Sequence, residues 1–383
     1  MLAVLVAIHL LAMAITIVYQ LASGYSNLDL AQYAVSVFYF YLLPIAMLVI
    51  LAFFIQTLSP GKYIGILIFF AYAMTELVLP QLGIEHNMAN YAGSPTPVYS
   101  DMNGYGIFLQ PHNWYMLYWS ALAVVFAVLS YGLWRRGTLT SLKSRWRLLG
   151  YQLGRGGFAA IAAALLVFIA AGSYIFYNTR VVNTFMGAEQ FMDLQAQYEK
   201  DYHQYRDDPL PITKRVDVDV AIYPADRRVV AKADIDVVNK GSEPIERFLV
   251  SLPLHLKTAD VKIHGGSFEL TDPEVRTGWF VFSEPMQPGE RRAGVLTSEI
   301  DHEGFKDRGH DFTVVENGTF INNAELLPLF GYQSSLQLVD QHERRKRDLE
   351  PVQRAHKLED ESRYTESFFD RSIDFIDFSA TIS

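Results

Sequence analysis

Long apolar stretches in the first half of the sequence constrain this chain more than any other feature. A helix needs about 20 mostly apolar residues to cross the hydrocarbon core of a bilayer. The first stretch has neither the basic leader nor the small-residue cleavage site of a signal peptide, so we interpret it as a true span. The sequence predicts a multi-span α-helical membrane domain over residues 1–177 with five spans, at about 1–21, 34–57, 63–82, 114–134 and 158–177.

The distribution of basic residues predicts the orientation of this domain. Lys62 is the sole basic residue before Arg135. Six basic residues and no acidic one lie between the fourth and fifth stretches: Arg135, Arg136, Lys143, Arg145, Arg147 and Arg155. Basic residues in short loops stay on the cytoplasmic side. We therefore expect this loop inside the cell, with residues 83–113 and everything after Tyr177 outside it.

Two ionisable side chains lie within the predicted spans. Glu76 is a possible transport-path carboxylate, because charged groups in a membrane are often functional, although pairing within the helix bundle would equally explain it. For His9 we expect a hydrogen bond to a neighbouring helix. The basic loop 135–155 could contact anionic lipid or an ATPase coupling surface, and lipid is the simpler interpretation.

The second half has the patterns of a short helical linker and then of strands. Residues 178–211 predict a helical stalk that ends before Pro209 and Pro211. From residue 212 apolar and polar residues alternate, which predicts a hairpin around Pro224. Further strands are expected at 245–252, 261–264, 278–283, 291–300 and 312–315. The fold expected for 212–383 is an all-β antiparallel sandwich or saddle-like domain.

The last part of the chain has two further features. Residues 341–364 are a charge run of mixed sign, typical of a solvated helix or loop. Residues 373–383 alternate like a strand as far as Ser383. Because the first span begins at Met1 and the last strand pattern has no closing turn, we expect the sequence to be a fragment of a longer protein.

Composition and motifs exclude several classes of function. The net charge is −9 and no basic face with interleaved aromatic residues occurs, which argues against nucleic acid as a partner. Cysteine is absent, so disulfides, Cys-ligated zinc and thiolate nucleophiles are excluded. His302-Glu303 and His342-Glu343 begin two near matches to H-E-x-x-H, but Lys306 and Lys346 replace the second histidine. The phosphate-binding G-x-x-x-x-G-K-[ST] motif and the G-x-S-x-G serine motif are also missing. We therefore predict no catalytic, cofactor-binding or metal-ligating residue in this chain.

Several short segments resemble one known family. They are 177–183 (YNTRVVN), 197–200 (QYEK) with Tyr202 and Tyr205, 218–224 (VDVAIYP), 237–240 (VVNK), and 317–328 (NGTFINNAELLP) followed by Gly331-Tyr332. Together they resemble bacterial fusions of an ABC transporter permease with an aminopeptidase N-like (gluzincin) metallopeptidase. The resemblance covers about 177–383, and the earlier spans agree with it in hydropathy and order.

The resemblance implies a location in the bacterial inner membrane, with the C-terminal domain periplasmic or extracellular. It implies that 212–383 is most of the N-terminal β domain of the peptidase. The catalytic domain and its zinc would follow downstream, so no zinc ligand is carried over here. Implied partners are the lipid bilayer, a separate ABC ATPase subunit and peptides. Two alternatives stay open: a complete non-enzymatic membrane-anchored protein whose β domain binds a periplasmic ligand or partner, and a peptidase-like scaffold that has lost its zinc ligands.

Overall fold

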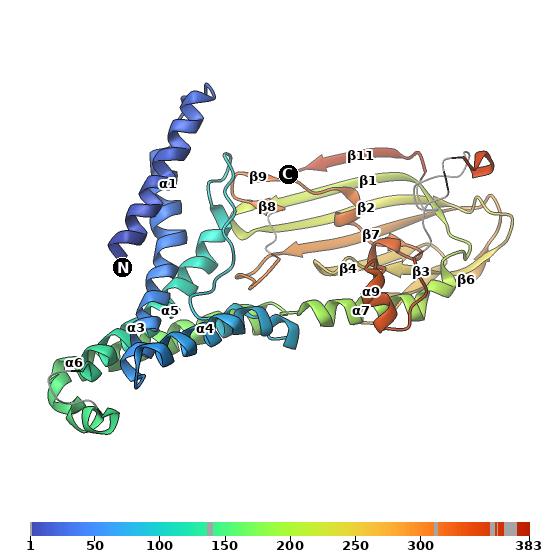
Figure 1. The fold of residues 1–383 in the computed structure, drawn as a ribbon. Helices are drawn as coiled ribbons and strands as arrows, with labels where there is room; N and C mark the ends of the chain where they lie inside the picture. The colour runs from blue at the N-terminus through green and yellow to red at the C-terminus, as the bar shows by residue number, and fades with distance from the viewer. Residues whose placement is uncertain (1, 136–140, 310–312, 353–356, 358, 364–373) are drawn as a thin grey trace. The chain divides into compact units, whose positions relative to one another are not determined.

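The computed structural model describes residues 2–135, 141–309, 313–352, 357, 359–363 and 374–383 (Figure 1). The chain divides into two compact units. Unit 1 consists of Met1–Gly187 and Gly304–His310, and unit 2 consists of Ala188–Glu303 and Asp311–Ser383. The boundary at Gly187 falls within the expected linker 178–211, and the predicted division into domains stays a prediction.

Unit 1 is helical. Its main helices are α1 (Leu2–Ala22), α2 (Leu30–Ala34), the π-helix η1 (Val35–Leu42), α3 (Leu43–Leu58), α4 (Lys62–Val78), α5 (Leu109–Leu133), α6 (Leu142–Phe176) and the π-helix η5 (Tyr177–Val182). Short 3₁₀ turns lie between α4 and α5, at η2 (Pro80–Leu82), η3 (Asn87–Ala89) and η4 (Gly106–Phe108). The helices α3, α4, α5 and α6 are drawn in blue to green in Figure 1.

Four helical stretches among the described residues are long and apolar enough to cross a membrane: Leu2–Ala22, Leu30–Leu58, Gly106–Leu133 and Leu142–Val182. They correspond to the first, second, fourth and fifth predicted spans. The third predicted span, residues 63–82, forms α4, which has 17 residues before a 3₁₀ turn begins at Pro80. Proline cannot continue the helical hydrogen bonding, which explains the early end. The membrane character is confirmed, and the count of five spans stays a prediction.

The basic segment before the last span is mostly helical and not a loop. Ser141 caps α6 by accepting a hydrogen bond from the Ser144 backbone N–H at 3.2 Å. Lys143, Arg145 and Arg147 therefore lie on α6, whereas Arg136 lies outside the described residues. The helix breaks at Gly154, whose φ of 57° is readily adopted by glycine alone. The expectation of a loop was wrong because apolar residues spaced between the basic ones give this segment a face that packs.

The interior of unit 1 forms around α5, which contacts both α3 and α6. Tyr115, Met116 and Trp119 of α5 pack with Met47 of α3 and Ile175 of α6. Close approach needs small residues. A Cβ added to Gly172 would lie 2.9 Å from the Tyr118 ring, and one added to Gly132 would lie 2.6 Å from Leu149 Cδ1. These glycines allow α5 and α6 to approach each other closely.

Unit 2 is a two-sheet sandwich, as expected from the alternating pattern. Its principal strands are β1 (Ile212–Tyr223), β2 (Arg228–Val238), β3 (Ile245–Ser251), β4 (Leu256–Ile263), β5 (Gly266–Asp272), β6 (Thr277–Met286), β7 (Arg291–Asp301), β10 (Leu329–Phe330) and β11 (Asp377–Ile382). One sheet has the order β11-β1-β2-β7-β4 and the other β10-β3-β6-β5. A separate pair joins β8 (Val314–Val315) and β9 (Gly318–Thr319).

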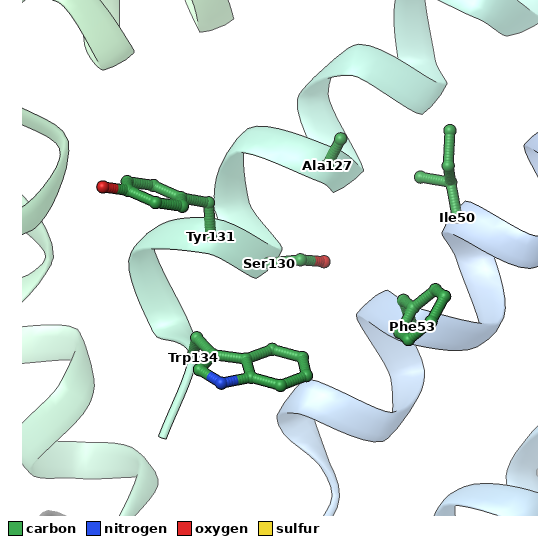
Figure 2. A pocket seen from close by; sticks show the side chains of 6 residues that line it. All are labelled: Ile50, Phe53, Ala127, Ser130, Tyr131 and Trp134. Carbon is green, nitrogen blue, oxygen red and sulfur yellow. The ribbon is translucent and has the colours of Figure 1, made fainter. Parts of the chain in front are cut away.

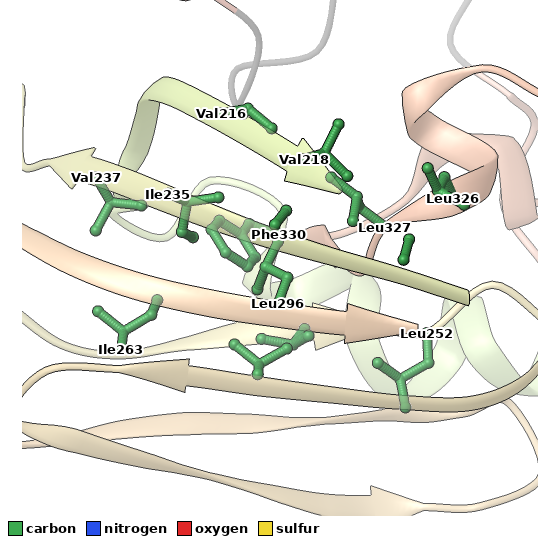
Figure 3. Close-up of a cluster of buried hydrophobic side chains, with 14 of the residues drawn as sticks. Val216, Val218, Ile235, Val237, Leu252, Ile263, Leu296, Leu326, Leu327 and Phe330 are labelled. Atoms are coloured by element: carbon green, nitrogen blue, oxygen red, sulfur yellow. The ribbon is translucent and has the colours of Figure 1, made fainter. Parts of the chain in front are cut away.

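The predicted hairpin is confirmed. Strands β1 and β2 pair antiparallel, with Val218 opposite Ala233 and Val220 opposite Ala231. Their alternate side chains point into the core, which Figure 3 shows between the two sheets. Leu252 and Phe330, from the second sheet and its flanks, reach into the same core. Burial on one face of each strand thus holds the sandwich together.

The other strand predictions are confirmed in part. Strand β4 begins five residues before the expected 261–264, and β5 was not expected because its side chains are largely exposed. The expected strand 312–315 is present as Val314–Val315, and Phe312 lies outside the described residues. The end of the chain forms β11, which pairs parallel with β1 and is therefore the exception in an otherwise antiparallel sheet.

Two charged or polar segments are also part of unit 2. The predicted stalk helix is present as α7 (Ala188–Tyr202). The Tyr198 ring of α7 stacks on Tyr332 with centroids 5.2 Å apart. The charge run 341–364 contains α9 (Gln341–Lys346) and η9 (Glu361–Arg363). Arg344 of α9 is buried and donates to both Glu199 carboxylate oxygens at 2.6 Å. A solvated segment was expected here, so the expectation was wrong for Arg344.

Candidate functional site

The two ionisable residues of the predicted spans lie on different helices. Glu76 is exposed on α4, and a role in transport stays a prediction. His9 lies on α1, where its Nδ1 is 2.8 Å from the Leu5 carbonyl of the same helix. The expected bond from His9 to a neighbouring helix is therefore wrong. A carbonyl one turn earlier lies within reach, so the ring needs no second helix.

The His-Glu pairs of the two near matches to the zinc motif belong to unit 2 and have different partners. His302 Nε2 is 3.2 Å from Thr313 Oγ1, and Glu303 accepts a hydrogen bond from Lys257 at 2.8 Å. Glu343 instead binds Lys346 at 2.7 Å. In the part of the chain that the structure describes, no group of three His, Asp or Glu residues could hold a metal ion.

Unit 1 contains a buried polar cluster that the sequence did not indicate. We call it the Asp307 cluster and define it as His86, Asn87, Tyr115, Thr179 and Asp307. Asp307 belongs to the segment that follows β7 in sequence and is assigned to unit 1. The whole Asp307 residue is 2% exposed, and its side chain is fully buried. A buried carboxylate is stable only when hydrogen bonds replace its lost water.

Two residues supply those hydrogen bonds. The Tyr115 hydroxyl, from the early part of α5, donates to Asp307 Oδ1. The backbone N–H of Asn87, at the start of η3, points at the carboxylate with distances of 3.2 and 3.3 Å to its two oxygens. The Asn87 side-chain amide donates to Oδ1 at 3.2 Å and to the Asp307 carbonyl at 3.3 Å. Charge-assisted bonds of this kind are stronger than neutral ones.

The hydrogen bonds of His86 define its tautomer. Thr179 Oγ1 donates to the Ile175 carbonyl at 2.8 Å, so it accepts from His86 Nε2–H at 3.0 Å. His86 Nδ1 accepts from the Met88 backbone N–H at 3.2 Å. Nδ1 therefore carries no proton in the neutral ring. Its 3.5 Å distance from Asp307 Oδ1 becomes an ion pair only when the ring is protonated.

The electrostatic surroundings keep this ring neutral. Burial lowers the pKa of His86 below its ordinary value of 6.5, and Arg180 and Arg308 lower it further, while Asp307 opposes the shift. Desolvation is the largest cause, because a charged imidazolium loses more on leaving water than a neutral ring does. At neutral pH the Asp307 charge is thus stabilised by donors and not by a cation on His86.

Residues on either side of Asp307 extend its contacts with unit 1. Arg308 donates to the Glu85 carboxylate at 2.6 Å and to the Glu85 carbonyl at 2.8 Å. Phe305 is 3% exposed and packs in the α3, α5 and α6 interior. The Asn183 side chain donates to the Phe305 carbonyl at 3.3 Å. Residues 304–309 therefore contact the rest of unit 1 at several points.

A second buried charge lies at the other end of α5. We call it the Arg145 cluster and define it as Thr57, Leu133 and Arg145. Arg145 is 4% exposed, and its Nη1 donates to the Thr57 and Leu133 carbonyls at 2.7 Å each. These carbonyls lie at the C-terminal ends of α3 and α5, where they lack intrahelical partners and carry the negative end of the helix dipole. Arg145 thus joins the ends of two helices to a third.

Both clusters attach segments of unit 1 that are distant in sequence to one another. The donors to Asp307, Asn87 and Tyr115, come from the protein itself, and the side chain is fully buried, so a substrate has no access to it. Sequence reasoning missed Asp307 because it lies in a charged segment that resembles a solvated turn. It missed the role of Arg145 because only topology was inferred from the basic residues.

Comparisons with known proteins give little further information. No protein-family description and no curated protein sequence matches this chain. Among solved structures, it is similar to the M1 zinc metallopeptidase of Deinococcus radiodurans, with 13% identity over 27% of this chain and a TM-score of 0.21. A mutant of that enzyme, alone and bound to a Tyr-Ser-Ala substrate, gives 14% identity over 28% of this chain and the same TM-score of 0.21. The match spans about a quarter of those peptidases, 25% to 26% of their length. A likeness this slight establishes neither a family nor an activity.

Proposed function

We propose that this chain is a multi-pass membrane protein that presents its β sandwich on the outer side of the membrane. Unit 1 would be a permease-like domain with five spans, and unit 2 the N-terminal β domain of an aminopeptidase N-like peptidase. The observation that carries the membrane arrangement is the Asp307 cluster. It binds the segment between β7 and β8 to the turns between α4 and α5.

The positions along α5 support this arrangement. Tyr115 and Leu133 are 18 residues apart, which corresponds to about 27 Å along a helix. That distance is close to the thickness of a bilayer hydrocarbon core, about 30 Å. The Asp307 cluster and the Arg145 cluster therefore suit opposite membrane surfaces. Since basic residues favour the cytoplasmic side, residues 304–309 and the strands that flank them in sequence belong outside.

The transport and peptidase parts of the proposal rest on the sequence resemblance. In that family the permease works with a separate ATPase, and the zinc ligands lie in a domain beyond the segment that this chain resembles. We propose a bacterial inner-membrane location, an ATPase partner at the end that carries Lys143 and Arg147, and peptides as ligands of the larger assembly. This chain would supply the anchor and the β domain.

Labelling of single cysteines tests the orientation, and the natural absence of cysteine makes each variant specific. Ser242→Cys, at an exposed position of unit 2, and Lys143→Cys, exposed on α6, are treated in intact cells with a membrane-impermeant maleimide. We expect labelling at position 242 in intact cells, and at 143 only after permeabilisation. Labelling of both positions from the same side would overturn the proposed orientation.

Cross-linking tests the permease-like role. A heterobifunctional cross-linker attached to Lys143→Cys in native membranes should capture a protein with a P-loop nucleotide-binding motif. Ser242→Cys serves as the matched control and should not capture it. If no nucleotide-binding protein is captured at 143 and a periplasmic protein is captured at 242, the non-enzymatic binding protein becomes the better account.

A further inference from the structure

An apolar groove lies between α3 and α5 near the Arg145 cluster. It has a volume of about 450 Å³ and is lined by Ile50, Phe53, Ala127, Ser130, Tyr131 and Trp134. Figure 2 shows Ser130 on α5, and Trp134 directly after α5, on the side that faces Phe53 of α3. The Phe54 and Phe126 rings stack with centroids 4.7 Å apart and join the two helices beside the groove. The groove is therefore a gap between helices that are in contact next to it.

The lining is suited to hydrocarbon. Ser130, the one aliphatic hydroxyl in the lining, donates to the Phe126 carbonyl at 2.6 Å, so its hydrogen is already used within α5. Trp134 and Tyr131 are exposed at the end of α5. Aromatic side chains with a polar atom favour the boundary between hydrocarbon and headgroups. The groove thus opens at the depth where acyl chains join lipid headgroups.

The groove-lining Trp134 is followed in sequence by a cation. Arg135 follows Trp134 and is exposed, and its Nη2 donates to the Ser59 carbonyl at 2.5 Å and the Pro60 carbonyl at 2.8 Å. These bonds hold the guanidinium at the turn between α3 and α4. A guanidinium has five N–H donors in a planar fork, so it can hold these carbonyls and still bind a phosphate.

The surrounding charge is positive and lacks carboxylates. No Asp or Glu occurs between Asp29 and Glu76 or between Asp101 and Glu189, stretches that include all of α3, α5 and α6. Lys62, Lys143 and Arg147 add further positive charge at the same end of these helices. The neutralising charge must therefore come from outside these segments. Anionic lipid is the most abundant source at an inner membrane surface.

We propose that the groove between α3 and α5 binds an acyl chain of an anionic phospholipid whose phosphate is held by Arg135. This inference rests on the proposed placement of unit 1 in the bilayer with its basic end at the inner surface. It adds a defined lipid site to that placement. General attraction of lipid to a basic surface would instead depend on the number of charges and not on the shape of the groove.

Quenching of Trp134 fluorescence by brominated lipid tests the proposal. The full chain is reconstituted in phosphatidylcholine nanodiscs with increasing phosphatidylglycerol that carries bromine on its acyl chains. Subtracting the signal of Trp134→Phe isolates Trp134 from the other tryptophans. We expect half-maximal quenching at a lower fraction of brominated phosphatidylglycerol than of brominated phosphatidylcholine.

Paired variants separate a site from a basic surface. Arg135→Gln should raise the half-quenching fraction about fivefold, as expected for the loss of one basic contact with an anionic lipid. Arg147→Gln removes the same charge from an exposed position of α6 and should change it by less than about twofold. Ala127→Phe fills the groove and should abolish the preference, whereas Val124→Phe, at an exposed position of the same helix, should preserve it.

The outcomes are distinct. Equal effects of Arg135→Gln and Arg147→Gln, or an unchanged preference in Ala127→Phe, would overturn the lipid site and leave the membrane placement intact. Failure of the wild-type chain to insert into nanodiscs of either lipid would overturn the placement and the site together. Circular dichroism of each variant shows whether its helices are preserved, and a second groove-filling variant, Ser130→Phe, replaces Ala127→Phe if that one does not fold.

Discussion

The Asp307 cluster and the Arg145 cluster both bury a charged group in unit 1, but they compensate for it differently. Asp307 receives hydrogen bonds from a tyrosine hydroxyl, a backbone N–H and an asparagine side chain. Arg145 donates to two backbone carbonyls at the ends of α3 and α5. The anion thus depends on particular side chains and on the backbone of one turn. The cation instead uses backbone carbonyl groups, which every helix end provides.

The two clusters differ in how much they require of the sequence. Helix ends accept a cation whatever their side chains are, so an arginine can join α3, α5 and α6 with few sequence requirements. A buried carboxylate needs dedicated donors, and these come from residues more than 190 positions away in sequence, as in the pair Tyr115 and Asp307. The Asp307 cluster is therefore the more specific attachment, and its loss should be the more costly.

Fluorescence can follow unit 1 separately. Trp114, Trp119, Trp134 and Trp146 belong to unit 1, and Trp279 to unit 2. In a Trp279→Phe background, unfolding in detergent monitored by tryptophan emission reports on unit 1. The stability predictions below use this background, because a single unfolding free energy for the whole two-unit chain would not be well defined.

The largest loss is expected for Asp307→Ala. It leaves the buried Tyr115 hydroxyl and the partly buried Asn87 N–H without their acceptor, and we expect a loss of about 3 kcal/mol in the unfolding free energy of unit 1. Asp226→Ala, at an exposed position of unit 2, should change it by less than about 0.5 kcal/mol. Equal effects of the two substitutions would contradict the importance of the buried carboxylate.

Arg145→Met should cost less, about 2 kcal/mol, because it keeps much of the side-chain volume and removes the donor to the Thr57 and Leu133 carbonyls. Arg147→Met, two residues later and exposed, is the matched control and should be nearly neutral. The unfolding free energy of unit 1 measures both. A loss for Arg145→Met larger than that for Asp307→Ala would reverse the order that we infer from the comparison.

Gly132→Ala tests the close packing next to the Arg145 cluster. The new Cβ would lie 2.6 Å from Leu149 Cδ1 and 2.8 Å from Leu153 Cδ2, so these buried leucine side chains must move. We expect a net loss of about 1 kcal/mol. Gly150→Ala on α6 has open space around its Cβ and should stabilise the helix by up to about 1 kcal/mol. Stabilisation by both substitutions would show that the helices are not in close contact there.

The smallest effect expected is a pH dependence from His86. Burial chiefly lowers its pKa below the ordinary 6.5, so the unfolded chain binds more protons than the folded one between the lowered value and 6.5. Stability should therefore fall as the pH drops below about 6.5 and should be constant above it with respect to this group. His86→Gln should reduce this fall in a melting series from pH 7.5 to 5.5. An identical fall in the variant would assign it to other groups.

The sequence predicted unit 2 better than unit 1. Alternation in 212–238 has a period of two residues and a turn at Pro224, and local patterns of this kind determine a hairpin such as β1 and β2. Strand β5 was missed because exposed strands such as Gly266–Asp272 lack that alternation. The helices of unit 1 were recognised by hydropathy, but their contacts were not, since apolar residues on all sides do not indicate which face packs.

Neither buried charge could be found from sequence alone. Asp307 lies in the segment DHEGFKDRGH (301–310), whose composition is typical of an exposed turn. Arg145 is one of several basic residues before the last span, and the topology rule treats them alike. What distinguishes both residues is burial among partners that are distant in sequence, and one sequence carries no pattern for such pairs.

A double-mutant cycle between Asp307 and Tyr115 tests the central claim most directly. Asp307→Ala, Tyr115→Phe and the double variant are unfolded in the Trp279→Phe background, and the coupling energy follows from the differences in unit 1 stability. The account predicts a coupling of about 1.5 to 3 kcal/mol, as for a hydrogen bond to a buried charge. Additive losses, with a coupling near zero, would show that Asp307 is not held by α5 and would remove the basis for placing residues 304–309 in unit 1.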